Sequence, residues 1–308
     1  MLPLLVSNGF VRVIPPLQRA RAMALAALSG DEQLVIFVQL CNPLDPGVAV
    51  AFASASKELW ELTQAPRQQL QADYEAAGAL VRKAGKQGCK GLREATSVWL
   101  TQIGVSSDNL ALLGTLGSVL PALKELRLNE AAAGPDGVQR LAEKLGAGAL
   151  PAVTWLDLID VHVGDAGASA LAAALGRGAL PRLKRLYLGG TAIGDAGLVA
   201  LAPALRRRPA LEGLSLAGNP LGDEGLAAFV APPPPAGAPP PTTGGLAKLK
   251  LLDLTNTQVT NAGCATLAAA LDSGALPALG YLALDGIPAS AAAKAAVYAA
   301  RPNLKDHL

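Results

Sequence analysis

Six short segments of the chain repeat one order of apolar and polar residues, with leucine or valine at the first position and leucine at the fourth and sixth. The six segments are Leu123–Leu128, Val153–Leu158, Leu183–Leu188, Leu211–Leu216, Leu249–Leu254 and Leu279–Leu284. Subtracting successive starting positions gives spacings of 30, 30, 28, 38 and 30 residues. A period of this length indicates a stack of repeats, in which each unit buries its apolar face against its neighbours.

Each repeat predicts a short strand, a tight turn and a helix. Leucines two residues apart place apolar side chains on one face of the strand and leave the residues between them on the other face. A Gly-Asp-x-Gly or related motif precedes each helix, and its Asp or Asn is expected to cap the N-terminus of that helix. The expected capping residues are Asp165, Asp195, Asp223 and Asn261. Three units end in Gly-Ala-Leu-Pro, because proline prevents the helix from continuing.

The repeat length, the leucine spacing and the Gly-Asp-x-Gly turn resemble the leucine-rich repeats of the ribonuclease-inhibitor type over residues 89–308. The resemblance implies an α/β fold, a right-handed solenoid or horseshoe arc with parallel inner strands and outer helices. That family usually has Asn or Cys at the bend after the strand. Asn219 matches this pattern, and Thr191 and Thr257 can still donate a hydroxyl to the backbone. Val161 cannot, so we expect a weaker hydrogen-bond ladder there.

Three regions differ in pattern along the chain. Residues 1–27 form a lead-in without a clear period, residues 28–88 predict short helices, and residues 89–308 carry the repeats. The first 30 residues contain three arginines and no acid, which fits either a helical lead-in or an organelle transit segment. A proline-rich insertion at residues 231–245 interrupts the repeats. It fits either a passive loop or a ligand for an aromatic-lined groove.

The small all-helical segment at residues 28–88 resembles an F-box. The predicted helices span residues 31–40, 47–63 and 68–83. The F-box pattern has an apolar helix ending in leucine, a Leu-Asp-Pro-like turn and a Ser-Lys helix ending in Glu-Leu. The resemblance implies docking on the adaptor of a cullin-RING ubiquitin ligase. The expected adaptor-binding residues are Leu28, Ile36, Leu40, Pro43 and Leu44. Ser29, Gln33 and Leu59 depart from the pattern, and a helical cap for the first repeat is the alternative.

Composition and charge narrow the classes of partner. Apolar residues make up 51% of the chain and aromatic residues only 4%, so the core is built mainly from alanine and leucine. The net charge of +2 gives no overall field toward nucleic acid or an acidic membrane, and we expect neither as a partner. Cys41, Cys89 and Cys264 lie far apart without a Cys-x-x-Cys motif. This spacing favours reduced thiols in an intracellular, cytoplasmic protein.

Residues suited to catalysis are scarce. His162 and His307 are the two histidines of the chain, and the sequence has no metal-binding, nucleophile–base or phosphate-loop motif. We therefore expect no enzymatic activity and no cofactor. A GTPase-activating regulator similar to the Ran-directed leucine-rich-repeat family is a further alternative, although residues 301–308 are not the acidic tail that it would need.

The residues between the strand leucines form two columns on the face that the repeats leave open. The columns are Glu125, Trp155, Arg185, Gly213, Leu251, Tyr281 and Arg127, Asp157, Tyr187, Ser215, Asp253, Ala283. Because aromatic residues and arginine dominate the energetics of many interfaces, we predict that a protein partner binds this concave face. The predicted contact residues are Glu125, Arg127, Trp155, Asp157, Arg185, Tyr187, Ser215, Leu251, Asp253 and Tyr281.

Overall fold

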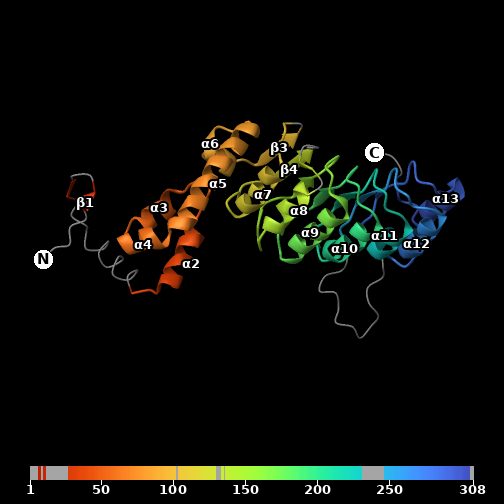
Figure 1. Cartoon of the computed structure of the whole chain (residues 1–308). Coiled ribbons are helices and arrows are strands. Elements are labelled where there is room, and N and C mark those ends of the chain that lie inside the picture. The colour runs from red at the N-terminus through yellow and green to blue at the C-terminus, as the bar shows by residue number, and fades with distance from the viewer. Residues whose placement is uncertain are drawn as a thin grey trace. The chain divides into compact units, whose positions relative to one another are not determined.

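The computed structural model describes residues 6–7, 10–11, 27–101, 103–129, 133–134, 136–230 and 246–305. The proline-rich insertion, most of the lead-in and the tail that contains His307 lie outside these residues. The chain divides into two compact units, Met1–Glu75 and Ala76–Leu308. Figure 1 shows the elements in chain order.

The first unit contains one strand pair and a group of helices. Strands β1 (Val6–Ser7) and β2 (Phe10–Val11) pair antiparallel. The helices are α2 (Gly30–Leu40), α3 (Gly47–Ala53), α4 (Lys57–Leu62) and the first part of α5 (Gln64–Lys83). Phe37 of α2 packs with Ala49 and Ala53 of α3 and with Leu70 of α5 in a small buried core.

Ser29, one of the departures from the F-box pattern, has a local role at the start of α2. Its hydroxyl accepts a hydrogen bond from the backbone N–H of Glu32, and the Glu32 carboxylate accepts one from the backbone N–H of Ser29. The two residues thus form a capping box, which satisfies two N–H groups that the helix leaves unpaired. The backbone and hydroxyl hydrogen bonds from Ser29 also lower the pKa of Glu32.

The predicted helix over residues 47–63 is two helices in the structure. The Ser56 hydroxyl accepts a hydrogen bond from the backbone N–H of Leu59, so a new N-terminus forms and α4 begins at Lys57. Helix α5 begins at Gln64 and not at residue 68 as predicted. Pro66 is tolerated there because the first turn of a helix needs no intrahelical partner for its N–H groups.

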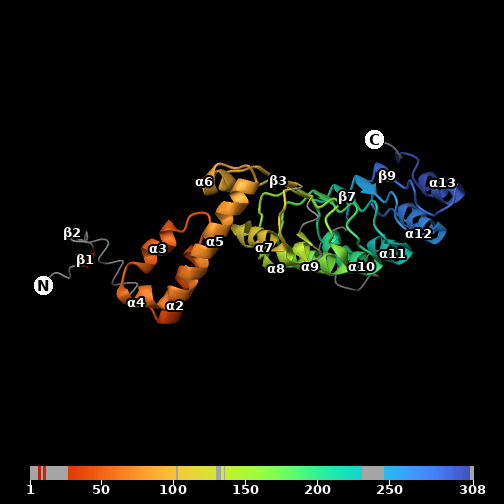
Figure 2. The same ribbon diagram turned by 45° about the horizontal axis from the view of Figure 1, so that its top comes forward.

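The second unit is a seven-stranded parallel sheet whose strands follow one another in chain order. The strands are β3 (Ser97–Thr101), β4 (Glu125–Asn129), β5 (Trp155–Asp157), β6 (Arg185–Tyr187), β7 (Gly213–Ser215), β8 (Leu251–Asp253) and β9 (Tyr281–Ala283). The helices are α6 (Gly88–Arg93), α7 (Ser107–Thr115), η1 (Leu116–Ser118), α8 (Gly137–Lys144), α9 (Gly164–Gly176), α10 (Asp195–Arg206), α11 (Asp223–Val230), α12 (Asn261–Asp272) and α13 (Ala291–Ala300). Figures 1 and 2 show α7 to α13 in one row on one side of the sheet. The predicted solenoid with inner strands and outer helices is confirmed.

The strand leucines form one buried row, as the repeat pattern predicts. The residues of the row pair in register across adjacent strands, in the order Leu126, Leu156, Leu186, Leu214, Leu252 and Leu282. All six are buried between the sheet and the helices. Val98 of β3 pairs with Leu126 and extends the row by one strand beyond the six that the sequence predicts.

The predicted N-caps are wrong in one respect: the Asp residues cap the helix of the next repeat. Asp165 Oδ1 accepts hydrogen bonds from the backbone N–H groups of Gly194 at 2.7 Å and Gly197 at 3.0 Å. Asp195 Oδ1 accepts from Gly222 and Gly225 in the same way, at 2.7 and 2.8 Å. The physical reason is position, because Asp165 and Asp195 lie in the first turn of their own helices.

The same contact explains the second glycine of the Gly-Asp-x-Gly motif. A Cβ atom on Gly197 would lie 2.5 Å from Asp165 Oδ1, and a Cβ atom on Gly225 would lie 2.7 Å from Asp195 Oδ1. The motif is therefore an interaction between consecutive repeats. Asp223 and Asn261 continue it, accepting hydrogen bonds from the N–H groups of Thr260 and Ser290.

Buried polar side chains at the bends after the strands join the repeats further. The Asn219 side chain accepts hydrogen bonds from the backbone N–H groups of Thr191 and Ile193 and donates to the carbonyls of Leu188 and Leu216. The hydroxyls of Thr191 and Thr257 donate to backbone carbonyls, as predicted. The apolar side chain of Val161 is buried at the equivalent bend, and the weaker ladder there stays a prediction.

Arginines at the helix ends act across repeats as well. The sequence predicts that the cations at residues 206–208 meet the negative end of their own helix. In the structure, Arg208 instead donates to the carbonyl of Ala179 in the preceding repeat, at 2.9 Å. Arg177 and Arg301 make equivalent contacts with Ala142 and Ala275. Consecutive repeats are therefore held together at both ends of the helices.

Candidate functional site

The two predicted columns lie side by side on the face of the sheet opposite the leucine row. In the first column Glu125 pairs with Trp155, Trp155 with Arg185, and the pairing continues to Tyr281. In the second column Arg127 pairs with Asp157, and Asp157 with Tyr187. The register places these side chains on one surface, since residues two apart in a strand share a face.

Five residues of the inner face, four of them from these columns, form a continuous group that we call the aromatic–arginine cluster. The cluster is Trp99, Arg127, Trp155, Arg185 and Tyr187. The Arg127 guanidinium lies 5.1 Å from the centre of the Trp99 ring and 4.4 Å from that of Trp155. Arg185 lies 5.2 Å from the Trp155 ring, and Tyr187 meets the same ring edge-on with a centroid distance of 5.5 Å. Cations over aromatic faces and edge-on aromatic pairs are both favourable arrangements.

Trp99 is the member of the cluster that the sequence reasoning missed. It is 57% exposed on β3, the first strand of the sheet, beside Arg127. Its strand reads Ser97-Val-Trp-Leu-Thr101, in which Val98 and Leu100 alternate with polar or exposed residues as in the other strands. The alternation of apolar and polar residues was therefore visible in the sequence, but this strand lacks the Leu-x-x-Leu-x-Leu spacing of the six regular repeats.

Trp155 lies at the centre of the cluster and carries an unsatisfied polar atom. Its indole Nε1 is buried and has no hydrogen-bond partner among the described residues. A buried N–H without an acceptor costs about 1–3 kcal/mol relative to one that is paired. Arg185, which lies over this ring, is exposed and makes no ion pair with any residue that the structure describes.

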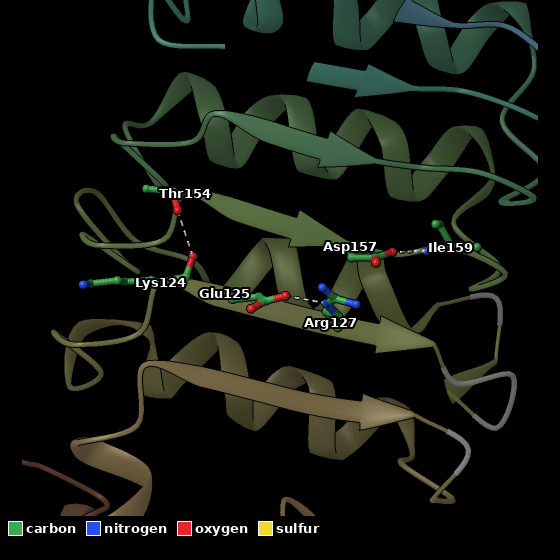
Figure 3. A network of polar contacts seen from close by, with 6 residues as sticks. All are labelled: Lys124, Glu125, Arg127, Thr154, Asp157 and Ile159. Atoms are coloured by element: carbon green, nitrogen blue, oxygen red, sulfur yellow. Dashed lines mark hydrogen bonds and ion pairs between the residues drawn. The ribbon is translucent and has the colours of Figure 1, made fainter. Parts of the chain in front are cut away.

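The positive and negative charges in and beside the cluster are equal in number. Glu125 and Arg127 form an ion pair within β4 (Figure 3). Asp157 Oδ1 accepts a hydrogen bond from the backbone N–H of Ile159 at 3.1 Å, which tightens the turn after β5. Two acids and two arginines, counting Arg185, therefore share this part of the face.

The remaining predicted contact residues lie further along the sheet, on β7 to β9. Asp253 accepts hydrogen bonds from the Ser215 hydroxyl at 2.9 Å and from the backbone N–H of Thr255 at 3.0 Å. Leu251 and Tyr281 are paired neighbours on β8 and β9, and both are half-buried. These residues share the inner face with the cluster but lie on its other half, formed by β7 to β9.

The five predicted adaptor-binding residues differ in exposure. Leu28, Ile36 and Leu40 are half-buried, whereas Pro43 and Leu44 are buried, with Leu44 only 5% exposed. The two buried residues contribute to the local fold and offer little surface to a partner.

A different set of apolar side chains is open to solvent in the first unit. Val35 and Val38 on α2 are each 56% exposed, and Val48 on α3 is 58% exposed.

Two features are absent from the described part of the chain. No group of three or more His, Cys, Asp or Glu side chains among these residues could hold a metal ion. No described helix has both the length and the apolar character that crossing a membrane requires.

Comparison with known proteins supports the repeat architecture. A leucine-rich repeat family model matches residues 180–202 and 211–230. A search of curated protein sequences found no match.

Three solved structures are among those to which the chain is similar. A leucine-rich repeat protein of Leptospira interrogans has 18% identity, with 64% of this chain and 45% of that chain covered and a TM-score of 0.32. TLR13 in complex with ssRNA13 has 16% identity, coverage of 70% and 33%, and a TM-score of 0.34. An internalin of Listeria monocytogenes has 14% identity, coverage of 76% and 87%, and a TM-score of 0.28. The chain spans less than half the length of the first two.

The matched segments, the parallel sheet and the buried leucine row show that the chain has the fold of the leucine-rich repeat class. Proteins of this class generally act in protein–protein interaction, and most are non-enzymatic interaction modules.

Proposed function

We propose that this protein binds another protein on the inner face of its repeat sheet, through the aromatic–arginine cluster. The observation that carries the proposal is the position of Trp155 among Arg127, Arg185 and Tyr187 on an open strand face. Tryptophan, tyrosine and arginine are the residues most enriched at binding hot spots, where truncation costs about 2 kcal/mol or more. The buried leucine row does not need these side chains, so their role lies at the surface.

The test combines partner capture with a double variant. A partner captured with the full chain would be purified, and its affinity measured for the wild type and for Trp155→Ala/Tyr187→Ala. We expect at least a hundredfold loss, since each truncation removes about 2 kcal/mol or more. Val199→Ala, at an exposed valine of the outer helix α10, is the control, and it should bind as the wild type does. Full affinity of the double variant would refute the proposal.

A second candidate function concerns the first unit, which we propose as an F-box-like adaptor-binding segment. The observation in its favour is the exposed apolar surface of Val35, Val38 and Val48 on α2 and α3. Isolated exposed valines are ordinary, but Val35 and Val38 are three residues apart and therefore share one face of a helix. In this function the repeats would select the target and the helices would hold the ligase adaptor.

This second function has its own test. The full chain would be co-purified with the ligase adaptor, and Val35→Glu/Val38→Glu should abolish the interaction. Val199→Glu, at an exposed valine of α10, is the control for an added charge. No adaptor binding by the wild-type chain at micromolar concentration would remove the candidate.

We further propose that the repeats are of the ribonuclease-inhibitor type and that the protein acts inside the cell. Support for the repeat type comes from the outer helices, since α9, α10 and α12 have 13, 12 and 12 residues. Support for the compartment comes from Cys41, Cys89 and Cys264, which are all free thiols.

A further inference from the structure

The chemistry of the aromatic–arginine cluster fits one class of ligand, and we infer that it binds an uncharged, proline-rich extended segment of the partner protein. This inference rests on the proposed function, because it names the part of the partner that the same face would hold. It depends on three features of the cluster: its charge balance, its unsatisfied donors and the spacing of its tryptophans.

The charge balance disfavours a strongly acidic or basic ligand. Glu125 already neutralises Arg127 through their ion pair, and Asp157 and Arg185 contribute one further charge of each sign. A highly acidic peptide would gain from the arginines and lose equally from the carboxylates. An uncharged segment avoids both effects and leaves the aromatic faces to provide the contact area.

The unsatisfied donors select a ligand that supplies acceptors. Trp155 Nε1–H is buried without an acceptor among the described residues, and the Arg185 guanidinium is open to solvent and makes no ion pair with any of them. A proline-rich segment has carbonyl oxygens but few N–H groups, and its extended conformation makes no internal hydrogen bonds. Its carbonyls are therefore free to accept. The indole N–H is buried, so a neighbouring side chain would have to move to open it to the ligand.

The same donors argue against the other common forms of peptide ligand. The carbonyls of a helix are occupied by its own hydrogen bonds, so a docked helix would leave Trp155 Nε1–H unpaired. An added β-strand would use the backbone at the edge of a sheet, whereas the cluster lies on its face. Aromatic surfaces with a few donors are the usual recognition sites for extended proline-rich segments.

The two tryptophans are close enough together for one such segment to contact both. The distances from Arg127 to the Trp99 and Trp155 rings, 5.1 and 4.4 Å, add to 9.5 Å, which is the largest separation that the two ring centres can have. A polyproline helix rises about 3.1 Å per residue with three residues per turn, so equivalent positions recur about every 9 Å. One turn of a polyproline helix is about as long as this largest separation, so a single segment could reach both rings on either side of Arg127.

The test is a calorimetric titration of the full chain with synthetic peptides that have blocked ends. The probes are a repeated Pro-Pro-Ala peptide, an alanine-rich helical peptide of equal length and a glutamate-rich peptide. We expect the proline peptide to bind with a dissociation constant of about 10⁻⁴ M and the other two to bind at least tenfold more weakly.

Variants assign the binding to the cluster. Trp155→Phe keeps an aromatic face but removes the N–H, and it should weaken binding about tenfold, as should Trp99→Ala, which removes an exposed ring. Trp60→Phe, at an exposed tryptophan of the first unit, is the control and should leave the affinity unchanged. Circular dichroism would confirm that each variant is folded.

The outcomes separate this inference from the proposed function. If the proline peptide does not bind at millimolar concentration, if the acidic or helical peptide binds more tightly, or if the two cluster variants bind as the wild type does, the inference is wrong. The proposed function stands in those cases as long as Trp155→Ala/Tyr187→Ala still loses the captured partner. If that double variant keeps the partner, the proposed function itself fails.

Discussion

The two halves of the inner sheet face have the same backbone and very different surfaces. Strands β4 to β6 present Arg127, Arg185 and Tyr187 around the ring of Trp155. On β7 to β9 the equivalent positions include a glycine, a serine and an alanine, and they hold one aromatic residue and no arginine. Both halves keep the buried leucine row.

The comparison shows that the fold and the binding surface depend on different residues. The leucines that alternate with the surface positions hold the repeats together, and each repeat contacts mainly its neighbours. Most of the residues between the leucines are not buried in this core. Bulky aromatic and cationic side chains gathered in one half therefore point to a function for that half.

The largest expected effect tests whether the two halves share one core. Leu186→Ala in the first half and Leu252→Ala in the second should each lower the free energy of unfolding by about 2–5 kcal/mol, because both side chains are buried. Urea denaturation would measure the loss, with Arg185→Ala as the exposed control. A loss below 1 kcal/mol for either leucine would show that the two halves do not contribute equally to the stability of the core.

A binding measurement tests whether the two halves differ in function. Trp155→Ala and Tyr281→Ala truncate aromatic residues of the same column in opposite halves. We expect the first to weaken partner binding by about 2 kcal/mol and the second by less than about 0.5 kcal/mol. Equal losses would mean that the partner covers the whole face, and the contrast between the halves would then have no functional meaning.

A smaller effect tests the contact that joins consecutive repeats on the helix side. Asp195→Ala removes the acceptor of two backbone hydrogen bonds from Gly222 and Gly225, and it should cost about 1–2 kcal/mol of stability. Asp195→Asn keeps an acceptor oxygen and should cost clearly less. Thermal unfolding of the two variants would show the difference. Identical melting temperatures for Asp195→Ala and the wild type would contradict the inter-repeat cap.

The smallest effect concerns an ion-pair network that links the two halves of the sheet. Glu212 lies between Lys184 at 3.4 Å and Lys250 at 3.0 Å, and the hydrogen bond from Lys250 is the main cause that lowers the pKa of Glu212. A lowered pKa means that the carboxylate stabilises the fold above the ordinary carboxyl pKa. That contribution is lost as the pH falls through the lowered value.

Glu212→Gln should therefore cost less than about 1 kcal/mol at neutral pH and nothing at strongly acidic pH. Urea denaturation of the variant and the wild type over a range of pH would measure this difference. High salt should reduce it at neutral pH, because the pair is partly exposed. If the difference in unfolding free energy between Glu212→Gln and the wild type grew as the pH fell, the lowered pKa of Glu212 would be contradicted.

Much of the candidate site was visible in the linear pattern. Leucines two residues apart specify which side of each strand is buried, so Trp155, Arg185 and Tyr187 could be assigned to the open face from their positions alone. Trp99 could not be assigned in this way, because its strand lacks the regular leucine spacing. Only the pairing of Trp99 with Arg127 across β3 and β4 shows that it belongs to the same surface.

Local sequence signals also left the direction of several contacts open. The motif around Asp195 predicts a capping residue, but it does not say which helix is capped. The structure shows that Asp195 reaches Gly222 and Gly225 in the following repeat, and that Arg208 reaches Ala179 in the preceding one. These partners lie about one repeat away along the chain, so no local pattern can reveal them.

Periodicity was sufficient to establish the leucine-rich repeats, the parallel sheet and the buried row, because each of these depends on residue spacing within a repeat. The gathering of Trp99, Arg127, Trp155, Arg185 and Tyr187 depended on the register between strands and on how neighbouring side chains pack. A strand pattern specifies which face a side chain occupies, whereas contact with a side chain on the next strand is decided when the repeats stack.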